Sequence, residues 1–399
     1  MPEDHTNPTE EHQMLRAMVR DWTKEFVEPQ AHVHDKQEKF NLELLRDLGG
    51  LGLLGISAPE EYGGSNLDAT ACVMVHEELS YSDPGFALAF LAHSMLFVNN
   101  FAHNANEEQK ARILPKVCSG EWIGAMAMSE PDAGTDVLGL SSTATKQVDG
   151  SYILNGRKMW ITNGCLDDQG TPADVVLVYA KTGEDEHGRV QISTFLVEAG
   201  MEGYSVGQKI MDKTGMRASN TAELVFDGCK IPAANLIGEE GQSMVHMMGN
   251  LELERLTLAA MSLGIARRCL HEMNQYASDR TAFGQCIREF GQIQKYIGDS
   301  WAKYRAMRAY IYDTAYNYQI GCAGQRLDSD GVKLFASVAA KEIADAAIQV
   351  MGGYGYVAEY HVERLWRDSK LLEIGGGTLE SHQKNITRDL SKSPEVINE

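Results

Sequence analysis

Hydrophobic residues change their spacing twice along this 399-residue chain, and this double change constrains the fold more than any other feature. In the first part of the chain, apolar residues recur at helical intervals, as at Met14 and Met18. Short β-branched runs between turn dipeptides follow, which is typical of strands, and helical spacing then returns over long stretches. The sequence therefore predicts three domains, helical, β and helical, over residues 1–120, 121–237 and 238–399.

Turn signals divide these domains into elements. The first domain is predicted to contain five or six helices, and the last contains segments long enough for a four-helix bundle. In the middle domain, Asp149-Gly150 and Asn155-Gly156 predict tight hairpins, because such pairs tolerate positive φ angles. Further strands are expected over residues 175–180, 191–198 and 222–226. The expected fold class is α+β, with an N-terminal helical domain, a β-barrel or sandwich, and a C-terminal four-helix bundle.

Charge and composition exclude several classes of function. The formal net charge of −20 opposes nucleic-acid binding, because phosphate affinity requires clustered Lys and Arg. The seven cysteines contain no C-x-x-C pair and the histidines show no metal-binding spacing, so we expect free thiols and no metal. No run of about 18 apolar residues indicates a membrane span. Residues 1–11 lack a secretory or transit pattern, so we expect the cytoplasm in a bacterium, or the mitochondrial matrix for a eukaryotic protein without its presequence.

Two loops rich in small polar residues are candidates for binding a polar ring system. Residues 127–136 (AMSEPDAGTD) follow an apolar strand, and residues 156–164 (GRKMWITNG) come further along the chain. Backbone N–H groups and hydroxyls in such loops can hydrogen-bond a ligand, although the first loop taken alone is better explained as a surface turn. A Trp beside Thr and Asn-Gly at a strand end is a less ordinary core position.

With three further segments, these loops resemble the signature segments of acyl-CoA dehydrogenases. The further segments are residues 213–221 (KTGMRASNT), 280–285 (RTAFGQ) and 349–355 (QVMGGYG). The order and spacing of the five segments match those of the family over nearly the whole chain, and the predicted order of helical, β and helical domains agrees as well. The resemblance implies an FAD-dependent acyl-CoA dehydrogenase with the flavin between the β domain and the C-terminal bundle. It also implies an electron-transferring flavoprotein as electron acceptor and a homotetramer as the assembled state.

The resemblance assigns candidate binding residues. Those that match positions at the flavin ring are Met128, Ser129, Trp160, Ile161 and Thr162. Those that match positions at the pyrophosphate, beside the cofactor or on a segment reaching FAD of a neighbouring subunit are Arg280, Phe283, Gln349, Gly352 and Gly353. Thr135, Thr378 and Glu380 complete the cofactor set. The candidate substrate contacts are Thr135, Glu252, Arg255, Gly375 and Gly376. The chain departs from the family at Gly291, where a Gln is frequent, so adenosine binding differs in detail.

Abstraction of a proton next to a thioester carbonyl requires a positioned general base. In most relatives this base is a Glu directly before the Gly-Thr of the C-terminal signature, but here the segment reads LEIGGGT and places Gly376 there. Glu254 shares a helix face with apolar residues, in a stretch that resembles the location used by isovaleryl-CoA and long-chain dehydrogenases. We therefore predict Glu254 as the catalytic base and Glu373 as the competing candidate. Glu252 is expected in an exposed salt link to Arg255.

Gly375 and Gly376 replace a bulkier Tyr-Glu-like pair and clear space for a β-branch, as in isovaleryl-type enzymes. The predicted reaction is α,β-dehydrogenation of a short branched acyl-CoA, such as isovaleryl-CoA, to the 2-enoyl-CoA. Val245 replaces an aromatic of the isovaleryl enzymes and residues 165–173 are inserted, so a longer citronellyl-type acyl group is an alternative. An acyl-CoA oxidase or flavin monooxygenase on the same fold, and a non-catalytic scaffold, are further alternatives.

Overall fold

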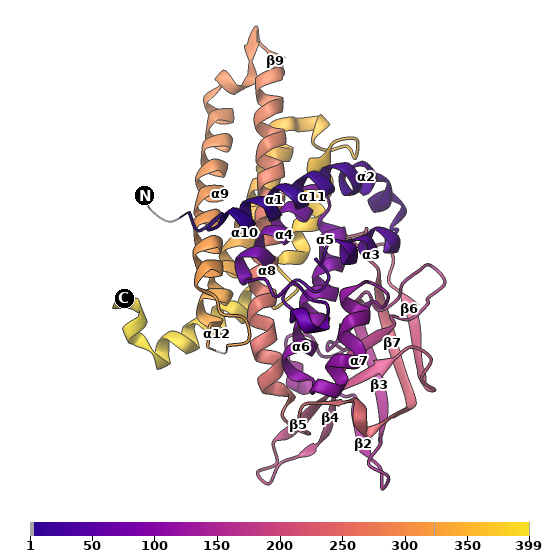
Figure 1. Ribbon diagram of the computed structural model, residues 1–399. Helices are drawn as coiled ribbons and strands as arrows, with labels where there is room; N and C mark the ends of the chain where they lie inside the picture. The colour runs from indigo at the N-terminus through magenta and orange to yellow at the C-terminus, as the bar shows by residue number, and fades with distance from the viewer. Residues whose placement is uncertain (1–3, 323, 399) are drawn as a thin grey trace.

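The computed structural model describes residues 4–322 and 324–398. Figure 1 shows the N-terminal helices packed in the middle of the molecule, with the β domain on one side and the long C-terminal helices on the other. The predicted order of helical, β and helical regions and the α+β fold class are confirmed.

The N-terminal region consists of five helical rods in the described residues. Their bounds are α1 (Glu10–Trp22), continued by η1 (Thr23–Val27) and α2 (Glu28–Gln37); α3 (Leu42–Gly50); α4 (Ala69–Ser82); α5 (Pro84–Leu91), continued by η3 (Ala92–Asn99) and α6 (Asn100–Asn104); and α7 (Glu107–Cys118). The rod over residues 84–104 is long and apolar enough to cross a membrane, but 94% of its apolar window is buried inside the protein. It is built as a core helix, because its apolar surface is already covered by protein.

The β domain is an eight-stranded sheet in the described residues. Its strands are β1 (Gly124–Ala127), β2 (Thr143–Lys146), β3 (Tyr152–Thr162), β4 (Val175–Glu184), β5 (Val190–Glu198), β6 (Tyr204–Lys209), β7 (Thr221–Ile231) and β8 (Leu236–Ile237). The order is β6-β7-β3-β2-β4-β5-β8, with β1 paired to β4. Asp149-Gly150 forms the predicted β2–β3 turn, whereas the hairpin predicted at Asn155-Gly156 is wrong. Gly156 lies within β3 at a register shift, where it closely approaches Ser142, so its positive φ serves a bulge.

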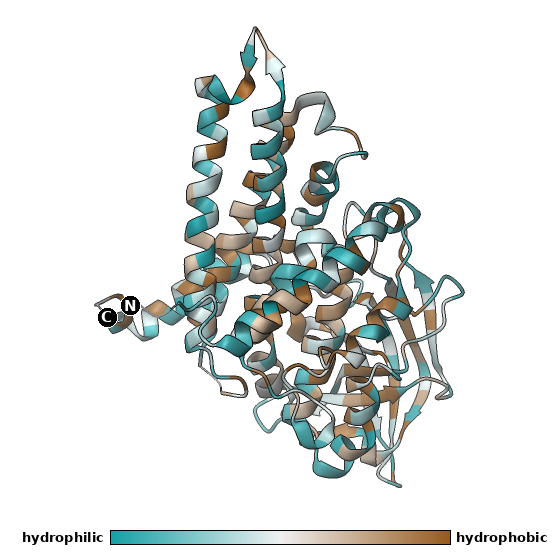
Figure 2. Cartoon of the chain, turned by 45° about the horizontal axis from the view of Figure 1, so that its top comes forward, coloured by the Kyte–Doolittle hydropathy of each residue, from teal (hydrophilic) through white to brown (hydrophobic). Residues whose placement is uncertain are grey.

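The C-terminal region is organised around one long central helix. Its elements are α8 (Ser243–Asp279), β9 (Thr281–Ala282), β10 (Gln285–Cys286), α9 (Gly291–Asn317), α10 (Arg326–Met351), η7 (Gly352–Tyr354), α11 (His361–Leu372) and α12 (Leu379–Lys392). Helix α8 packs against α4, α9, α10 and α11, so it is covered on several faces. Figure 2 shows hydrophobic residues gathered where the helices meet and hydrophilic residues on their outward turns.

The cysteines are free thiols in the described residues, as the sequence predicts, and five of the seven are buried. The part of the chain that the structure describes contains no group of three His, Cys, Asp or Glu side chains placed to hold a metal ion.

Candidate active site

A buried ion pair fixes the loop that follows β1 to strand β3. Lys158 Nζ donates to Glu130 Oε1 at 2.9 Å and to the Met128 carbonyl at 3.1 Å, and both charged side chains are buried. Burial opposes the ionisation of Glu130, but hydrogen bonds from Ser141 and Ser142 and the charge of Lys158 outweigh it and lower the pKa of Glu130 to about 2. The sequence identifies the loop as a binding element but not the ion pair that shapes it.

A bulge in β3 turns Trp160 outward beside this loop. The pairing of β3 with β7 shifts register around Trp160, which has a φ of +67° and a side chain that is 62% exposed. The Met159 N–H donates to the Ser129 carbonyl at 2.9 Å. Ile161 is buried and Thr162 is half-buried at the end of the strand. The residues expected at the flavin ring are therefore gathered on one edge of the β domain.

Glu254 is a buried carboxyl on α8 whose oxygens accept no hydrogen bond in the described residues. Its side chain is 6% exposed, and Oε2 has no hydrogen-bond partner in the described residues. Burial raises the pKa of Glu254 to about 7, against the opposing charges of Arg255 and Lys333. Burial also raises the pKa of Asp368 to about 7, but Asp368 accepts the Met216 N–H at 2.6 Å. Of these two carboxyls, Asp368 is engaged by the Met216 backbone and lies 3.9 Å from Arg364, whereas the Glu254 carboxyl accepts no hydrogen bond in the described residues.

The glycine turn after α11 lies directly opposite Glu254. A Cβ atom at Gly376 would lie 3.5 Å from Glu254 Oε1 and would clash with Leu258 Cδ1, and φ at this position is +64°. The position of the usual family base is therefore adjacent to the carboxyl predicted to replace it. At Gly375, a Cβ would make only ordinary contacts with Leu371. The protein itself therefore leaves room for a side chain at Gly375 but not at Gly376.

A buried polar cluster lies behind this turn. Lys333 Nζ donates to the Gly377 carbonyl at 2.7 Å, and His382 Nε2 lies 3.1 Å from the same oxygen. His382 Nδ1 lies 2.7 Å from Asp330 Oδ1, and Arg255 Nη1 lies 3.1 Å from that carboxyl oxygen without hydrogen-bond alignment. All four side chains are buried. The sequence pattern singles out Arg255 alone, although the spacing of Asp330 and Lys333 on one helix face is a signal for the rest.

One expectation for the nearby carboxylates needs revision. Glu252 is buried rather than exposed, and its partner is the Gln325 N–H at 3.1 Å instead of Arg255. The reason is that α8 lies inside the bundle, so residues beside its apolar stripe are covered as well. The competing base candidate, Glu373, accepts from Lys370 Nζ at 2.6 Å. Its carboxylate is already engaged in an ion pair, which makes it the weaker candidate.

One chain does not bring all predicted cofactor residues together. Arg280 and Phe283 lie at the β9–β10 tip of the α8–α9 pair, at the opposite end of the molecule from β3 (Figure 1). Phe283 has a φ of +52° and is 95% exposed. The rings of Tyr276 and Tyr354 are 5.9 Å apart, so residues 349–353 lie at this end too. The predicted contacts thus form two separate groups within one subunit.

The remaining candidates flank these groups. Thr135 is exposed in the loop after β1. Thr378 caps α12, where its Oγ1 accepts the Ser381 N–H at 3.3 Å, and Glu380 is exposed in the first turn. Thr378 and Glu380 directly follow the glycine turn that faces Glu254, so they belong to the same part of the site. The side chain of Val245 lies outside the described residues.

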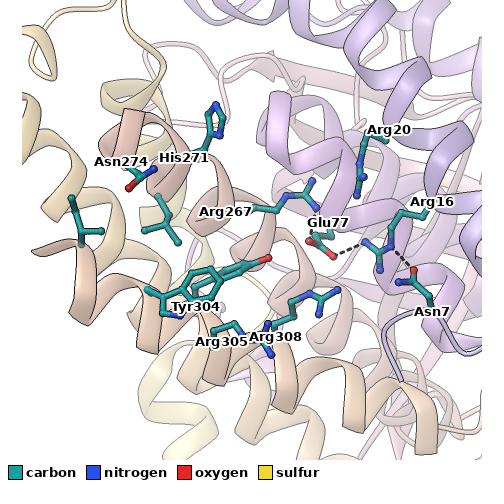
Figure 3. Close-up of a pocket in the computed structure, with 13 residues that line it drawn as sticks. Asn7, Arg16, Arg20, Glu77, Arg267, His271, Asn274, Tyr304, Arg305 and Arg308 are labelled. Carbon is teal, nitrogen blue, oxygen red and sulfur yellow. Dashed lines mark hydrogen bonds and ion pairs between the residues drawn. The ribbon is translucent and has the colours of Figure 1, made fainter. Parts of the chain in front are cut away.

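A cavity of about 830 Å³ between α1, α4, α8 and α9 lies outside this site (Figure 3). It contains none of the predicted binding residues. Arg16 Nη1 donates to Glu77 Oε2 at 3.0 Å, and Arg267 Nη1 donates to Glu77 Oε1 at 2.7 Å. These arginines are held in a structural ion-pair network between the N-terminal and C-terminal helices.

The α+β fold, the exposed aromatic on the β domain and the buried carboxyl beneath the glycine turn can be compared with known proteins. The family models of acyl-CoA dehydrogenase match the N-terminal domain at residues 9–121, the middle domain at 125–229 and the C-terminal domain at 243–391. The chain belongs to the acyl-CoA dehydrogenase family.

Individual relatives agree with this assignment. The chain is 42% identical to mitochondrial isovaleryl-CoA dehydrogenase of Pongo abelii, over 95% of this chain and 88% of the relative. It is 39% identical to mitochondrial 2-methylacyl-CoA dehydrogenase of Solanum tuberosum, over 95% and 90%. The structure of butyryl-CoA dehydrogenase from Megasphaera elsdenii superposes with a TM-score of 0.90 at 34% identity, covering 96% of this chain and 98% of the other.

The enzyme is an FAD-dependent oxidoreductase that dehydrogenates acyl-CoA. The residues present fit this cofactor. Trp160 and Phe283 are aromatic side chains held at positive φ with most of their surface uncovered, as contact with a planar ring system requires. Met128, Ser129 and Thr162 are the residues that would hold the ring edge at Trp160.

Proposed function

We propose that this enzyme dehydrogenates a short, branched acyl-CoA of the isovaleryl type and that Glu254 is its catalytic base. The observation that carries the proposal is the buried Glu254 carboxyl, which accepts no hydrogen bond in the described residues and whose Oε1 is 3.5 Å from where a Cβ at Gly376 would lie. The identity to isovaleryl-CoA dehydrogenases supports the same substrate class, which is that of leucine breakdown.

The chain's residues have distinct tasks in this reaction. Glu254 takes the proton from the carbon next to the thioester carbonyl, and burial keeps this carboxyl basic enough to act near neutral pH. FAD, when bound, supplies the acceptor for the hydride that leaves the adjacent carbon. Arg255 is buried with Nη1 3.1 Å from Asp330 and with Nε free of hydrogen bonds, and the free Nε supports a role in holding the polar part of the acyl-CoA. Electrons then pass to an electron-transferring flavoprotein.

The open space at Gly375 supports a branched substrate. A Cβ atom at this position would meet only Leu371, at ordinary contact distances. A methyl branch of the substrate can use the same space. A second candidate is a 2-methyl-branched acyl-CoA, which the identity to 2-methylacyl-CoA dehydrogenase favours.

We infer a homotetramer in which a neighbouring subunit completes each FAD site. The separation of Arg280 and Phe283 from the β-domain edge supports this arrangement, since the matched residues lie at opposite ends of a single chain (Figure 1). The largely uncovered Phe283 ring supports burial against a partner. The proposed compartment is the cytoplasm for a bacterial source and the mitochondrial matrix for a eukaryotic one, since relatives include mitochondrial enzymes.

The test is a panel of acyl-CoA thioesters scored by bleaching of the oxidised flavin. Isovaleryl-CoA should reduce the flavin faster than 2-methylbutanoyl-CoA, octanoyl-CoA and a citronellyl-type thioester. A faster rate with 2-methylbutanoyl-CoA supports the second candidate instead. Reoxidation by electron-transferring flavoprotein without rapid peroxide formation is expected, whereas rapid peroxide formation in air identifies an oxidase.

A further inference from the structure

The glycine turn that faces Glu254 is held from behind by two donors on one carbonyl oxygen. Lys333 Nζ lies 2.7 Å and His382 Nε2 lies 3.1 Å from the Gly377 oxygen. A carbonyl oxygen only accepts hydrogen bonds, so both nitrogens donate. Gly377 has a φ of +103°, and a Cβ there would lie 2.9 Å from His382 Cε1. Glycine therefore allows the imidazole to approach the turn this closely.

The other ring nitrogen of His382 faces a second acceptor. His382 Nδ1 lies 2.7 Å from Asp330 Oδ1, and both side chains are fully buried. A neutral imidazole has a single N–H and can donate to only one of these two acceptors. Both contacts together therefore need a second proton on the ring, shared with Asp330. When this proton is lost, the shorter contact to Asp330 keeps the remaining N–H and the Gly377 carbonyl loses its donor from His382.

The surroundings make this proton labile. Burial lowers the pKa of His382, Asp330 raises it, and the charges of Lys333 and Arg255 lower it, with a net decrease. The proton is therefore bound in acid and lost as the pH rises through a range below the ordinary histidine pKa of about 6.5. The charged groups around the pair are Glu252, Glu254 and Arg255 on α8, Arg326 and Lys333 on α10, and Glu373 after α11.

We propose that Asp330 and His382 form a proton-dependent latch on the Gly377 carbonyl, which holds the glycine turn opposite Glu254 while the shared proton is present and loosens it when the proton is lost. Asp330 and His382 are positioning residues in this proposal. They influence the substrate only by holding the backbone of the turn. Only the catalytic consequence of the latch rests on the proposed function, in which Glu254 is the base. The latch itself is a property of α10, α12 and the turn.

Hydrogen exchange measured by mass spectrometry tests the latch on the FAD-bound enzyme without substrate. The readout is the protection of residues 374–381, corrected for the intrinsic pH dependence of exchange. In the wild-type enzyme, protection should fall by about tenfold or more between about pH 4.5 and pH 8.5, which corresponds to the loss of one charge-assisted hydrogen bond. Constant protection across this range overturns the proposal without any variant.

Asp330→Asn is the decisive variant. The introduced side-chain amide donates to Nδ1 of a neutral His382, whose Nε2–H still donates to Gly377, so the turn should stay protected at both pH values. A drop equal to that of the wild type overturns the proposal. The matched control is Asp389→Asn, which removes the negative charge paired with Arg326 between the same two helices and leaves the Gly377 carbonyl and its two donors in place. This control should keep the wild-type pH dependence.

The pH profile of flavin reduction gives a second, separate readout. The latch proton is lost below pH 6.5 and Glu254 ionises near pH 7, so the wild-type enzyme reacts with the latch already open. Asp330→Asn, which keeps the turn held, should therefore raise the rate of flavin reduction above pH 7 without shifting the rise that reports Glu254. A rate above pH 7 that Asp330→Asn leaves unchanged, with unchanged KM, counts against the latch. If no acyl-CoA reduces the flavin, the proposed function fails, whereas the exchange result still decides the latch.

Discussion

Replacing Glu254 with glutamine separates the chemistry of this carboxyl from its effect on stability. Glutamine has nearly the same shape but accepts no proton from carbon, so flavin reduction by isovaleryl-CoA should fall by about 10²- to 10⁴-fold. FAD content and acyl-CoA binding should remain. In the wild type, the rate should rise with pH through about 7, because burial raises the pKa of Glu254 to that value and only the ionised form acts as a base.

The same substitution should stabilise the protein in alkali. The pKa of Glu254 rises from 4.5 to about 7 on folding, a difference of about 2.5 units, which corresponds to about 3 kcal/mol per subunit at about 1.4 kcal/mol per unit. Because the folded-state pKa is the higher one, ionisation favours unfolding, and stability is lost as pH rises from 4.5 through 7. Glu254→Gln removes this loss. The gain should be largest above pH 7 and vanish towards pH 4.5.

Two assays on the same preparation test the base assignment and the effect of burial on the Glu254 pKa. Stopped-flow bleaching of the flavin measures the rate, and urea unfolding at pH 5 and pH 8 measures the free energy of unfolding. The expected result is a large loss of rate combined with higher stability at pH 8. A variant that reduces flavin at the wild-type rate refutes the base assignment. A variant that is less stable than the wild type at pH 8 refutes the burial argument.

Three further predictions follow from the site. Glu373→Gln should change flavin reduction by less than about threefold, since general-base losses are far larger and its carboxylate is engaged by Lys370; a loss as large as that of Glu254→Gln would transfer the base role to Glu373. Gly375→Val should lower the ratio of isovaleryl-CoA to butanoyl-CoA turnover, because the side chain refills the space assigned to the branch, and an unchanged ratio would place the branch elsewhere. Lys158→Met should leave Glu130 buried without its ion-pair partner, at a cost of about 3–5 kcal/mol in the free energy of unfolding, and should reduce FAD retention on gel filtration. Adding Glu130→Gln should recover part of the free energy of unfolding and part of the FAD retention. Full FAD content in Lys158→Met would show that the loop after β1 holds its shape without the ion pair.

Some features of the site were accessible from sequence because they depend on local pattern. The alternation of β-branched runs located β4, β5 and β7, and the helical spacing placed Glu254 on the apolar stripe of α8, where the structure finds it buried. Glu252 was placed on the solvent side by the same reasoning, yet it is buried too. Periodicity reports the most apolar face of a helix, but not how many neighbours surround it.

Sequence alone determined the order of the three domains, the family and the candidate base, because each is encoded by spacing or motif within short stretches of chain. Tertiary structure alone decided which groups meet at the glycine turn. Asp330 and Lys333 on α10 reach the turn that precedes α12, where His382 joins them, through the packing of helices against α8. Their burial and shared proton are consequences of that packing, because the desolvation that shifts a pKa depends on every neighbouring element and not on the residues adjacent in sequence.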